Sequence, residues 1–300
     1  MALLNEQQNN VALDVMKEYL SKVFADGKTA VEIEDQLDKD RVKLIDSELK
    51  PLLSDYLQGK VELADFKIKI NSINATNREL WGFNGIKGQM FFNMFFNIAE
   101  DLNELDAELK AAITVPQNED IASSRIKTFT SFVKRLGQEF VEAGNNPRKA
   151  PQLASVPYFL SYFWQIQDNE QWPVYYTNSV NTMIDLNLWQ PSGDQSQDYL
   201  TFKRIHEELI QLFSKHSGDK FNLYKVEHVF WFKGGNLGSY ESQEDTPASK
   251  EKSEAAKPSR INRLPDSYVP PIIAILPQMA ANTEELREAA KNSAITIEAI

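Results

Sequence analysis

Apolar side chains recur at helical spacing through most of the first 235 residues, and this periodicity limits the fold more than any other feature. Between Asn10 and Phe24 the apolar positions fall mostly three or four residues apart, which places them on one face of an α-helix. A strand-like pattern occurs only at 224–232, where a helix is also compatible with the sequence. We therefore predict a mainly α, multi-helix globular domain with at most a small β element. Further helices are predicted over 30–57 with an interruption at Pro51, and over 63–73, 89–112, 123–140, 156–167, 177–188 and 198–216.

The composition changes after residue 235. Residues 236–265 consist mostly of Ser, Glu, Lys, Asp and Ala with few apolar side chains, a composition typical of a solvated, flexible linker. Residues 266–300 then contain an apolar run from Val269 to Leu276 and a helical pattern that Thr283 can cap. We predict a helical recognition or regulatory domain over 1–235, a linker over 236–265, and the start of a further, truncated domain over 266–300.

Charge and cysteine content exclude several classes of protein. The formal net charge of −11 argues against a protein that wraps nucleic acid non-specifically, because such binding depends on Lys and Arg. The chain has no cysteine, which excludes disulfides, a thiol nucleophile and thiolate zinc sites. No apolar run approaches the roughly 20 residues that span a bilayer, and the N-terminus lacks the pattern of a secretory signal. We expect a cytoplasmic protein that does not enter a membrane.

A glycine-punctuated aromatic loop leads directly into the helix predicted from Gln89. Its order, Lys87-Gly88-Gln89, differs from the G-x-x-x-x-G-K-[ST] loop of nucleotide hydrolases, which excludes that chemistry here. The first amides of a helix have no partner within it and often bind anions. Two interpretations stay open: a tight connection between packed helices, which is the commoner arrangement, or a loop that binds a phosphate or a base. The residues of the second interpretation are Trp81, Asn84, Lys87, Gln89 and Asn93.

A local excess of basic residues follows this loop. Residues 121–150 carry six bases and two acids, whereas residues 151–200 carry five acids and no Lys or Arg. Several of the bases fall on the side of helix 123–140 opposite its apolar stripe, and Ser123 or Ser124 can cap this helix. We therefore expect a basic face that binds nucleic acid through phosphates. Its residues are Arg125, Lys127, Lys134, Arg135, Arg148 and Lys149.

Residue types that support catalysis occur, but not in a catalytic pattern. The three histidines are His206, His216 and His228. The first two do not form an H-E-x-x-H zinc motif, and we interpret them as solvated helix residues. His228 lies in an aromatic segment, where we expect a hydrogen-bonded core histidine. No serine occupies a nucleophile elbow, so we predict a chain that is not an enzyme by itself, without a metal site or a cofactor.

Eight aromatic residues crowd into positions 158–176. We expect most of them to pack in a helical core, because rings at helical spacing usually do so. The alternative is that a few Tyr and Trp side chains face a cleft beside Asp168 and stack on an unpaired base.

Two stretches carry a family resemblance. They are Leu80-Trp81-Gly82-Phe83-Asn84-Gly85 with Gly88-Gln89-Met90-Phe91-Phe92-Asn93, and Tyr158-Phe159-Leu160-Ser161-Tyr162-Phe163-Trp164 with Trp172-Pro173-Val174-Tyr175-Tyr176. Through them the chain resembles the helical N-terminal region of bacterial McrB-like restriction and anti-phage defence proteins, over about residues 50–235. The resemblance implies a recognition domain that precedes a motor or nuclease domain, and the signatures of those later domains do not occur in this sequence.

We therefore predict a nucleic-acid recognition or regulatory module of a defence protein, which binds DNA and passes this engagement to a downstream domain or partner subunit. The alternative is a protein–protein interaction scaffold without nucleic-acid binding, in which the acidic segment 151–200 docks a basic partner or a second copy of the chain. A third class is a hydrolase with an unusual site among Asp168, Glu170 and His228, which few sequence features favour.

Overall fold

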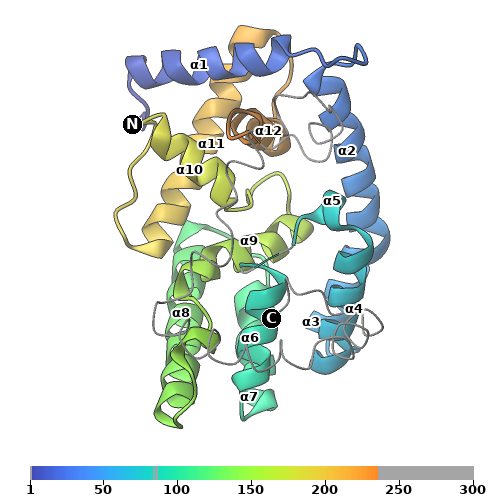
Figure 1. Ribbon diagram of the computed structural model, residues 1–300, viewed down its shortest axis with the longest axis vertical. Helices are drawn as coiled ribbons and strands as arrows, with labels where there is room; N and C mark the ends of the chain where they lie inside the picture. The colour runs from blue at the N-terminus through green and yellow to red at the C-terminus, as the bar shows by residue number, and fades with distance from the viewer. Residues whose placement is uncertain (1, 84, 86, 236–300) are drawn as a thin grey trace, which may run out of the picture. The chain divides into compact units, whose positions relative to one another are not determined.

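The computed structural model describes residues 2–83, 85 and 87–235, which are mainly α-helical (Figure 1). This confirms the predicted fold class. The β structure among these residues is one isolated bridge between Val23 and Thr29. The predicted linker and the predicted further domain lie outside the described residues. The α-helices are α1 (Glu6–Ser21), α2 (Ala30–Leu44), α3 (Lys50–Leu57), α4 (Leu63–Thr76), α5 (Arg78–Trp81), α6 (Gln89–Ile98), α7 (Leu102–Ile113), α8 (Glu119–Glu142), α9 (Val156–Gln167), α10 (Thr177–Asp185), α11 (Gln195–Ser217) and α12 (Leu223–Lys233).

Short polar side chains fix the starts of several helices. Asn5 accepts a hydrogen bond from the amide of Gln8 at α1, and Thr29 accepts one from the amide of Glu32 at α2. In both helices the third residue bonds back to the cap and closes a capping box. Asp194 similarly accepts two amide hydrogen bonds at the start of α11. These helix starts are therefore encoded by residues next to them in the sequence.

The helical path continues through Pro51 rather than breaking there. A short π-helix, Ile45–Leu49, joins α2 to α3, and Pro51 lies in the first turn of α3. A π-helical turn contains more residues than an α-helical turn, so the buried face of α3 is rotated relative to that of α2. The predicted interruption is thus a change of helical register just before the proline.

The single helix predicted over 89–112 is wrong. The chain leaves the helix at Ala99 and starts α7 at Leu102, where the Asp101 side chain accepts the amides of Asn103 and Glu104 at 2.8 and 3.1 Å. An aspartate at this position competes with the helix by capping the next one. Neither Gly nor Pro marks this break in the sequence.

Two other helix starts differ from the sequence-based prediction. α8 begins at Glu119 with Asn118 as its cap, so the caps predicted at Ser123 or Ser124 are wrong. The strand-like segment 224–232 belongs to α12, for which Asn222 accepts the amide of Lys225. Its apolar side chains are buried on several sides, which hides the helical period.

The buried side chains form two hydrophobic clusters. The first contains side chains from the end of α2 through α9 and from the segment that follows α9, together with Tyr199 and Leu200 of α11. The second joins α1, α2, α10, α11 and α12. In Figure 1, α9 lies between the group of α6, α7 and α8 and the group of α1, α10 and α12. The ring of Tyr175 contacts both clusters.

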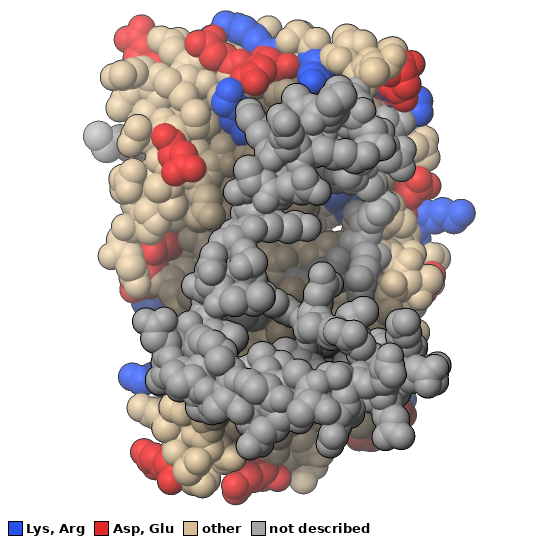
Figure 2. Space-filling model, viewed as in Figure 1, with Lys and Arg blue, Asp and Glu red and all other residues tan. Residues whose placement is uncertain are grey.

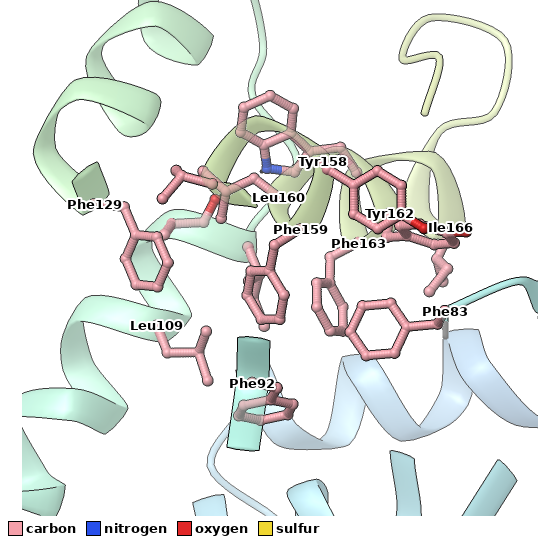
Figure 3. Packing of buried hydrophobic residues seen from close by; sticks show 14 of the residues in the cluster. Phe83, Phe92, Leu109, Phe129, Tyr158, Phe159, Leu160, Tyr162, Phe163 and Ile166 are labelled. Carbon is pink, nitrogen blue, oxygen red and sulfur yellow. Dashed lines mark hydrogen bonds between the residues drawn. The ribbon is translucent and has the colours of Figure 1, made fainter. Parts of the chain in front are cut away.

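Aromatic rings from several helices fill the first cluster. Figure 3 shows Phe159 and Phe163 of α9 among Phe83, Phe92 and Phe129. In the crowded segment 158–176, every aromatic side chain except half-buried Tyr175 is buried. The predicted core packing is therefore confirmed for most of this segment.

Candidate functional site

Hydrogen bonds from two helices, α2 and α9, hold the backbone at the start of the glycine loop. Nε of Arg41 on α2 donates to the Leu80 carbonyl at 3.0 Å. The Tyr162 hydroxyl on α9 donates to the Gly82 carbonyl at 2.7 Å, and that of Tyr158 donates to the same oxygen at 3.3 Å. Gly82 has φ +65°, and an added Cβ would lie 3.0 Å from the Tyr162 hydroxyl oxygen. Glycine is needed here both for the backbone conformation and for the close approach.

Trp81 points into the protein. Its ring is 3% exposed and stacks on Phe83, with ring centroids 4.6 Å apart. The edge of the Tyr162 ring also packs against it. In this conformation the indole cannot stack on a base from outside.

The start of α6 is closed by its own loop. The Gln89 amide donates to the Phe83 carbonyl at 3.1 Å, and the Met90 amide donates to the Gly85 carbonyl at 3.0 Å. Gly88 packs so closely that an added Cβ would lie 2.8 Å from the Phe83 oxygen. The Gln89 amide is therefore not open to a phosphate, because a loop carbonyl already accepts its hydrogen, and this argues against the phosphate-binding interpretation. This supports a tight connection between packed helices.

Four amide side chains form a row between α4 and α6. Nδ2 of Asn74 donates to Oε1 of Gln89 at 2.8 Å, and Nδ2 of Asn71 donates to Oδ1 of Asn93 at 3.3 Å. Gln89 and Asn93 are half-buried. Two of the predicted site residues are thus brought together, with partners on α4 that the sequence did not suggest.

Lys87 is half-buried, and burial lowers its pKa. None of the ion pairs found among the described residues includes it. Asn84, the remaining loop residue of the predicted site, lies outside the described residues.

Two residues of the predicted basic face are held by protein groups. Arg125 donates to the Thr114 carbonyl, and burial lowers its pKa. Arg135 pairs with Glu104 at 2.6 Å and with Glu139 at 3.0 Å. Both guanidinium groups therefore have strong local partners.

The other four basic residues are exposed. Lys127 and Lys134 lie two helical turns apart on one side of α8, and Arg148 and Lys149 lie in the short 3₁₀ turn that follows α8. None of the four pairs with a carboxylate in the part of the chain that the structure describes. We call them the α8 cation group.

An open hollow of about 310 Å³ lies beside this group. Lys134, Gln138 and Glu142 of α8 line it together with apolar side chains, and Ala150 and Pro151 form part of its other side. The hollow is shallow and mainly apolar.

The acidic segment 151–200 uses several carboxylates internally. Asp198 accepts hydrogen bonds from the Ser192 amide at 2.7 Å, the Ser192 hydroxyl at 2.8 Å and the Gly193 amide at 3.1 Å. Asp168 accepts the amides of two residues in its own turn, and Asp194 caps α11. Much of the acid excess of this segment thus accepts hydrogen bonds from backbone amides in turns and at the start of α11. On the face drawn in Figure 2, acidic and basic side chains both occur along the upper edge, close to one another.

The prediction of a solvated His206 is wrong. Its side chain is fully buried against Phe202, with ring centroids 4.1 Å apart. Nδ1 lies 2.9 Å from the Phe202 carbonyl oxygen, and burial lowers the pKa of His206 to about 4. His206 is therefore a neutral core residue at neutral pH, whereas His216 is exposed, as expected.

His228 belongs to a buried ionic cluster between α2 and α12. Nε2 lies 2.9 Å from Oδ1 of Asp38, and Nδ1 lies 3.1 Å from Oε2 of Glu34. Arg41 Nη1 lies 3.2 Å from Oδ1 of the same Asp38. This confirms that His228 is a hydrogen-bonded core residue. It bonds neither to Asp168 nor to Glu170 among the described contacts, so the three proposed hydrolase residues do not form one bonded set.

Glu227 completes the ionic cluster. Its Oε1 accepts Nε2 of Gln165 at 3.0 Å and the Val174 amide at 3.1 Å. Burial raises the pKa of Glu227 to about 7, although Arg41 and His228 act in the opposite direction. One signal for this cluster is present in the sequence: Glu34, Asp38 and Arg41 follow one another at helical spacing.

Two features concern the described residues as a whole: groups of metal-ligating side chains and helices that could span a membrane. Among residues 2–83, 85 and 87–235, no three His, Cys, Asp or Glu side chains are placed to hold a metal ion. Within the same residues, no helix combines the length and apolar character needed to cross a bilayer. Comparison with protein-family models, with curated proteins and with solved structures finds no match to this chain.

Proposed function

We propose that residues 1–235 form a nucleic-acid recognition module that is not catalytic by itself. The module binds phosphates through the α8 cation group: Lys127, Lys134, Arg148 and Lys149. The observation that carries this proposal is that these four exposed cations form no ion pair with a carboxylate among the described residues, although the charge of Lys127 helps to lower the pKa of Asp194.

The positions of these cations suit a line of phosphates. Lys127 and Lys134 are seven residues apart, which separates them by about 10 Å along α8 at a rise of ~1.5 Å per residue. Arg148 and Lys149 continue the basic surface beyond the end of the helix. Long, flexible cationic side chains contact a phosphate backbone without reading its sequence.

The competing interpretation, a scaffold with an acidic docking surface, has less support. Asp168, Asp194 and Asp198 accept hydrogen bonds from nearby backbone amides, so their charge is already partly compensated. The other two acids of this segment, Glu170 and Asp185, are exposed. The loop and α6 residues Trp81, Gln89 and Asn93 contribute packing and internal hydrogen bonds in this proposal rather than base contacts.

The wider role comes from the resemblance to McrB-like defence proteins. In that role the module acts in the cytoplasm in restriction or anti-phage defence. It passes DNA engagement to a downstream motor or nuclease domain or to a partner subunit.

A salt-dependent binding titration of the full chain tests the proposal. Single-stranded and duplex DNA are titrated at about 50 mM and about 200 mM salt. Four phosphate contacts predict that Kd rises by roughly 50- to 150-fold between these concentrations.

Charge reversal separates this surface from the net charge of the protein. In the double variant Lys127→Glu and Lys134→Glu, we expect the salt slope to fall by about half and the affinity to drop at least tenfold. The control is Lys39→Glu with Lys69→Glu, which changes the net charge equally at two exposed lysines of α2 and α4. Equal affinities of the two double variants, or no DNA binding by the unaltered chain, would contradict the proposal and favour the scaffold.

A further inference from the structure

Five ionisable side chains are buried together where α2 meets α12. They are Glu34, Asp38 and Arg41 of α2, with Glu227 and His228 of α12. The side chains of Glu34, Arg41 and His228 are at most 11% exposed and that of Asp38 is 16% exposed, and Glu227 is 1% exposed. Such groups are costly to bury unless their charges and hydrogen bonds balance.

Four of the five charges balance. Both ring nitrogens of His228 face carboxylates, at 3.1 Å from Glu34 and 2.9 Å from Asp38. An imidazole can donate from both nitrogens only when it is protonated. Burial alone would lower the pKa of His228, but its hydrogen bond to Asp38 and the negative charge of Glu34 raise it. His228 and Arg41 thus supply two positive charges against two carboxylates.

Glu227 is the fifth group and has no counter-charge of its own. Its Oε1 accepts two hydrogen bonds, whereas its buried Oε2 has no hydrogen-bond partner among the described residues. An ionised carboxylate in this position leaves a buried oxygen unsatisfied and adds net negative charge, and protonation removes that charge.

We propose that Glu227 is a proton-operated latch that holds α12 against α9 and the segment that contains Val174. When Glu227 is protonated, the cluster is neutral and the junction is closed. When Glu227 is ionised, its charge is uncompensated and the junction opens more often.

Few ionisable side chains around Glu227 other than His228 change their charge near neutral pH. Burial raises the pKa of each tyrosine that faces the cluster, so these side chains stay neutral. They are Tyr19 of α1, Tyr176 at the start of α10, Tyr199 of α11 and Tyr224 of α12. Lys225 pairs with Asp35 at 3.6 Å beside the cluster, and α10 contributes no buried ionisable side chain among its described residues. His228 titrates in the same direction as Glu227, because protonation of either favours the closed junction.

Hydrogen exchange on the full chain tests the latch. Protection factors are measured at about pH 6 and about pH 8 for α12 and for the Val174 amide, which Glu227 itself binds. Between these values the linkage of a group with a closed-state pKa near 7 and an open-state pKa near 4.5 predicts about tenfold more opening. The unaltered chain should therefore lose about tenfold protection at these positions.

Glu227→Gln removes the titration while keeping the side-chain shape and the acceptor for Val174. We expect its protection in α12 to be nearly equal at the two pH values. Glu100→Gln, at an exposed acid, should behave like the unaltered chain. Equal pH dependence in Glu227→Gln and the unaltered chain would overturn the latch. So would unchanged protection in the unaltered chain, a result that needs no variant to fold.

Discussion

Phe159 is the position where a single truncation should cost most in the first hydrophobic cluster. Its side chain is fully buried. Six phenylalanine rings lie with their centroids between 5.1 and 6.2 Å from its own: Phe83, Phe91, Phe92, Phe95, Phe129 and Phe163. They come from the glycine loop, α6, α8 and α9, and Figure 3 shows Phe83, Phe92, Phe129 and Phe163 around this ring.

The cost of Phe159→Ala follows from burial and cavity volume. Loss of the buried ring forfeits about 2–3 kcal/mol of transfer free energy. The removed volume of roughly 100 Å³ adds about 2 kcal/mol if the surrounding rings do not collapse. The offset and edge-to-face ring contacts oppose collapse, since each prefers its present geometry. We therefore expect the free energy of unfolding to fall by about 4–5 kcal/mol.

Urea unfolding followed by far-ultraviolet circular dichroism measures this loss. Phe140→Ala is the matched control, because Phe140 is only half-buried near the end of α8 and should lose about 1 kcal/mol. Phe159→Leu should fall between the two. If Phe159→Ala cost less than about 2 kcal/mol at an unchanged m value, the cluster would be able to repack and the reasoning from fixed ring contacts would fail.

Three further predictions have defined outcomes. Gly88→Ala should lower the free energy of unfolding by about 1–3 kcal/mol, because its Cβ would lie 2.8 Å from a backbone oxygen. Gly137→Ala, where the nearest atom is 3.8 Å away, should raise the free energy of unfolding by up to about 1 kcal/mol. Chemical denaturation of both variants measures these two changes. Asp198→Ala removes three hydrogen bonds at the start of α11 and should cost about 2–3 kcal/mol, seen as a lower Tm; an unchanged Tm would contradict this. The folded-state pKa of Glu227, about 7, exceeds its ordinary value of about 4.5. The stability that protonated Glu227 contributes to the folded state is therefore complete below about pH 4.5 and is lost as the pH rises through 7. Glu227→Gln should therefore remove roughly 3 kcal/mol of the fall in stability between about pH 4 and pH 8, and parallel curves for both chains would refute this assignment.

The helices could be predicted because their signal is local. Apolar residues three and four positions apart, with caps such as Thr29 before α2, identify a helix from a short window of sequence. The break between α6 and α7 was missed because its signal is a single capping aspartate, Asp101, which also fits the exposed face of a longer helix.

The candidate sites depended on information that the sequence does not carry. The basic residues were identified from composition, but only the structure separates Lys134, which forms no ion pair among the described residues, from Arg135, which two glutamates engage. Trp81 has the residue type of a stacking platform, and its burial is set by α9, some 80 residues later in the chain. The ionic cluster joins Asp38 to His228 across 190 positions, a separation that no local pattern bridges.

α11 contributes side chains to both hydrophobic clusters. Its first turns place Tyr199 and Leu200 in one cluster, and the following turns place Phe202 and Ile205 in the other. A helix of 23 residues extends about 34 Å as a stiff rod, so displacement of one end is transmitted to the other. The clusters are thereby coupled mechanically: melting either one removes the support that orients the helix for its neighbour, and heat should unfold both in one calorimetric peak.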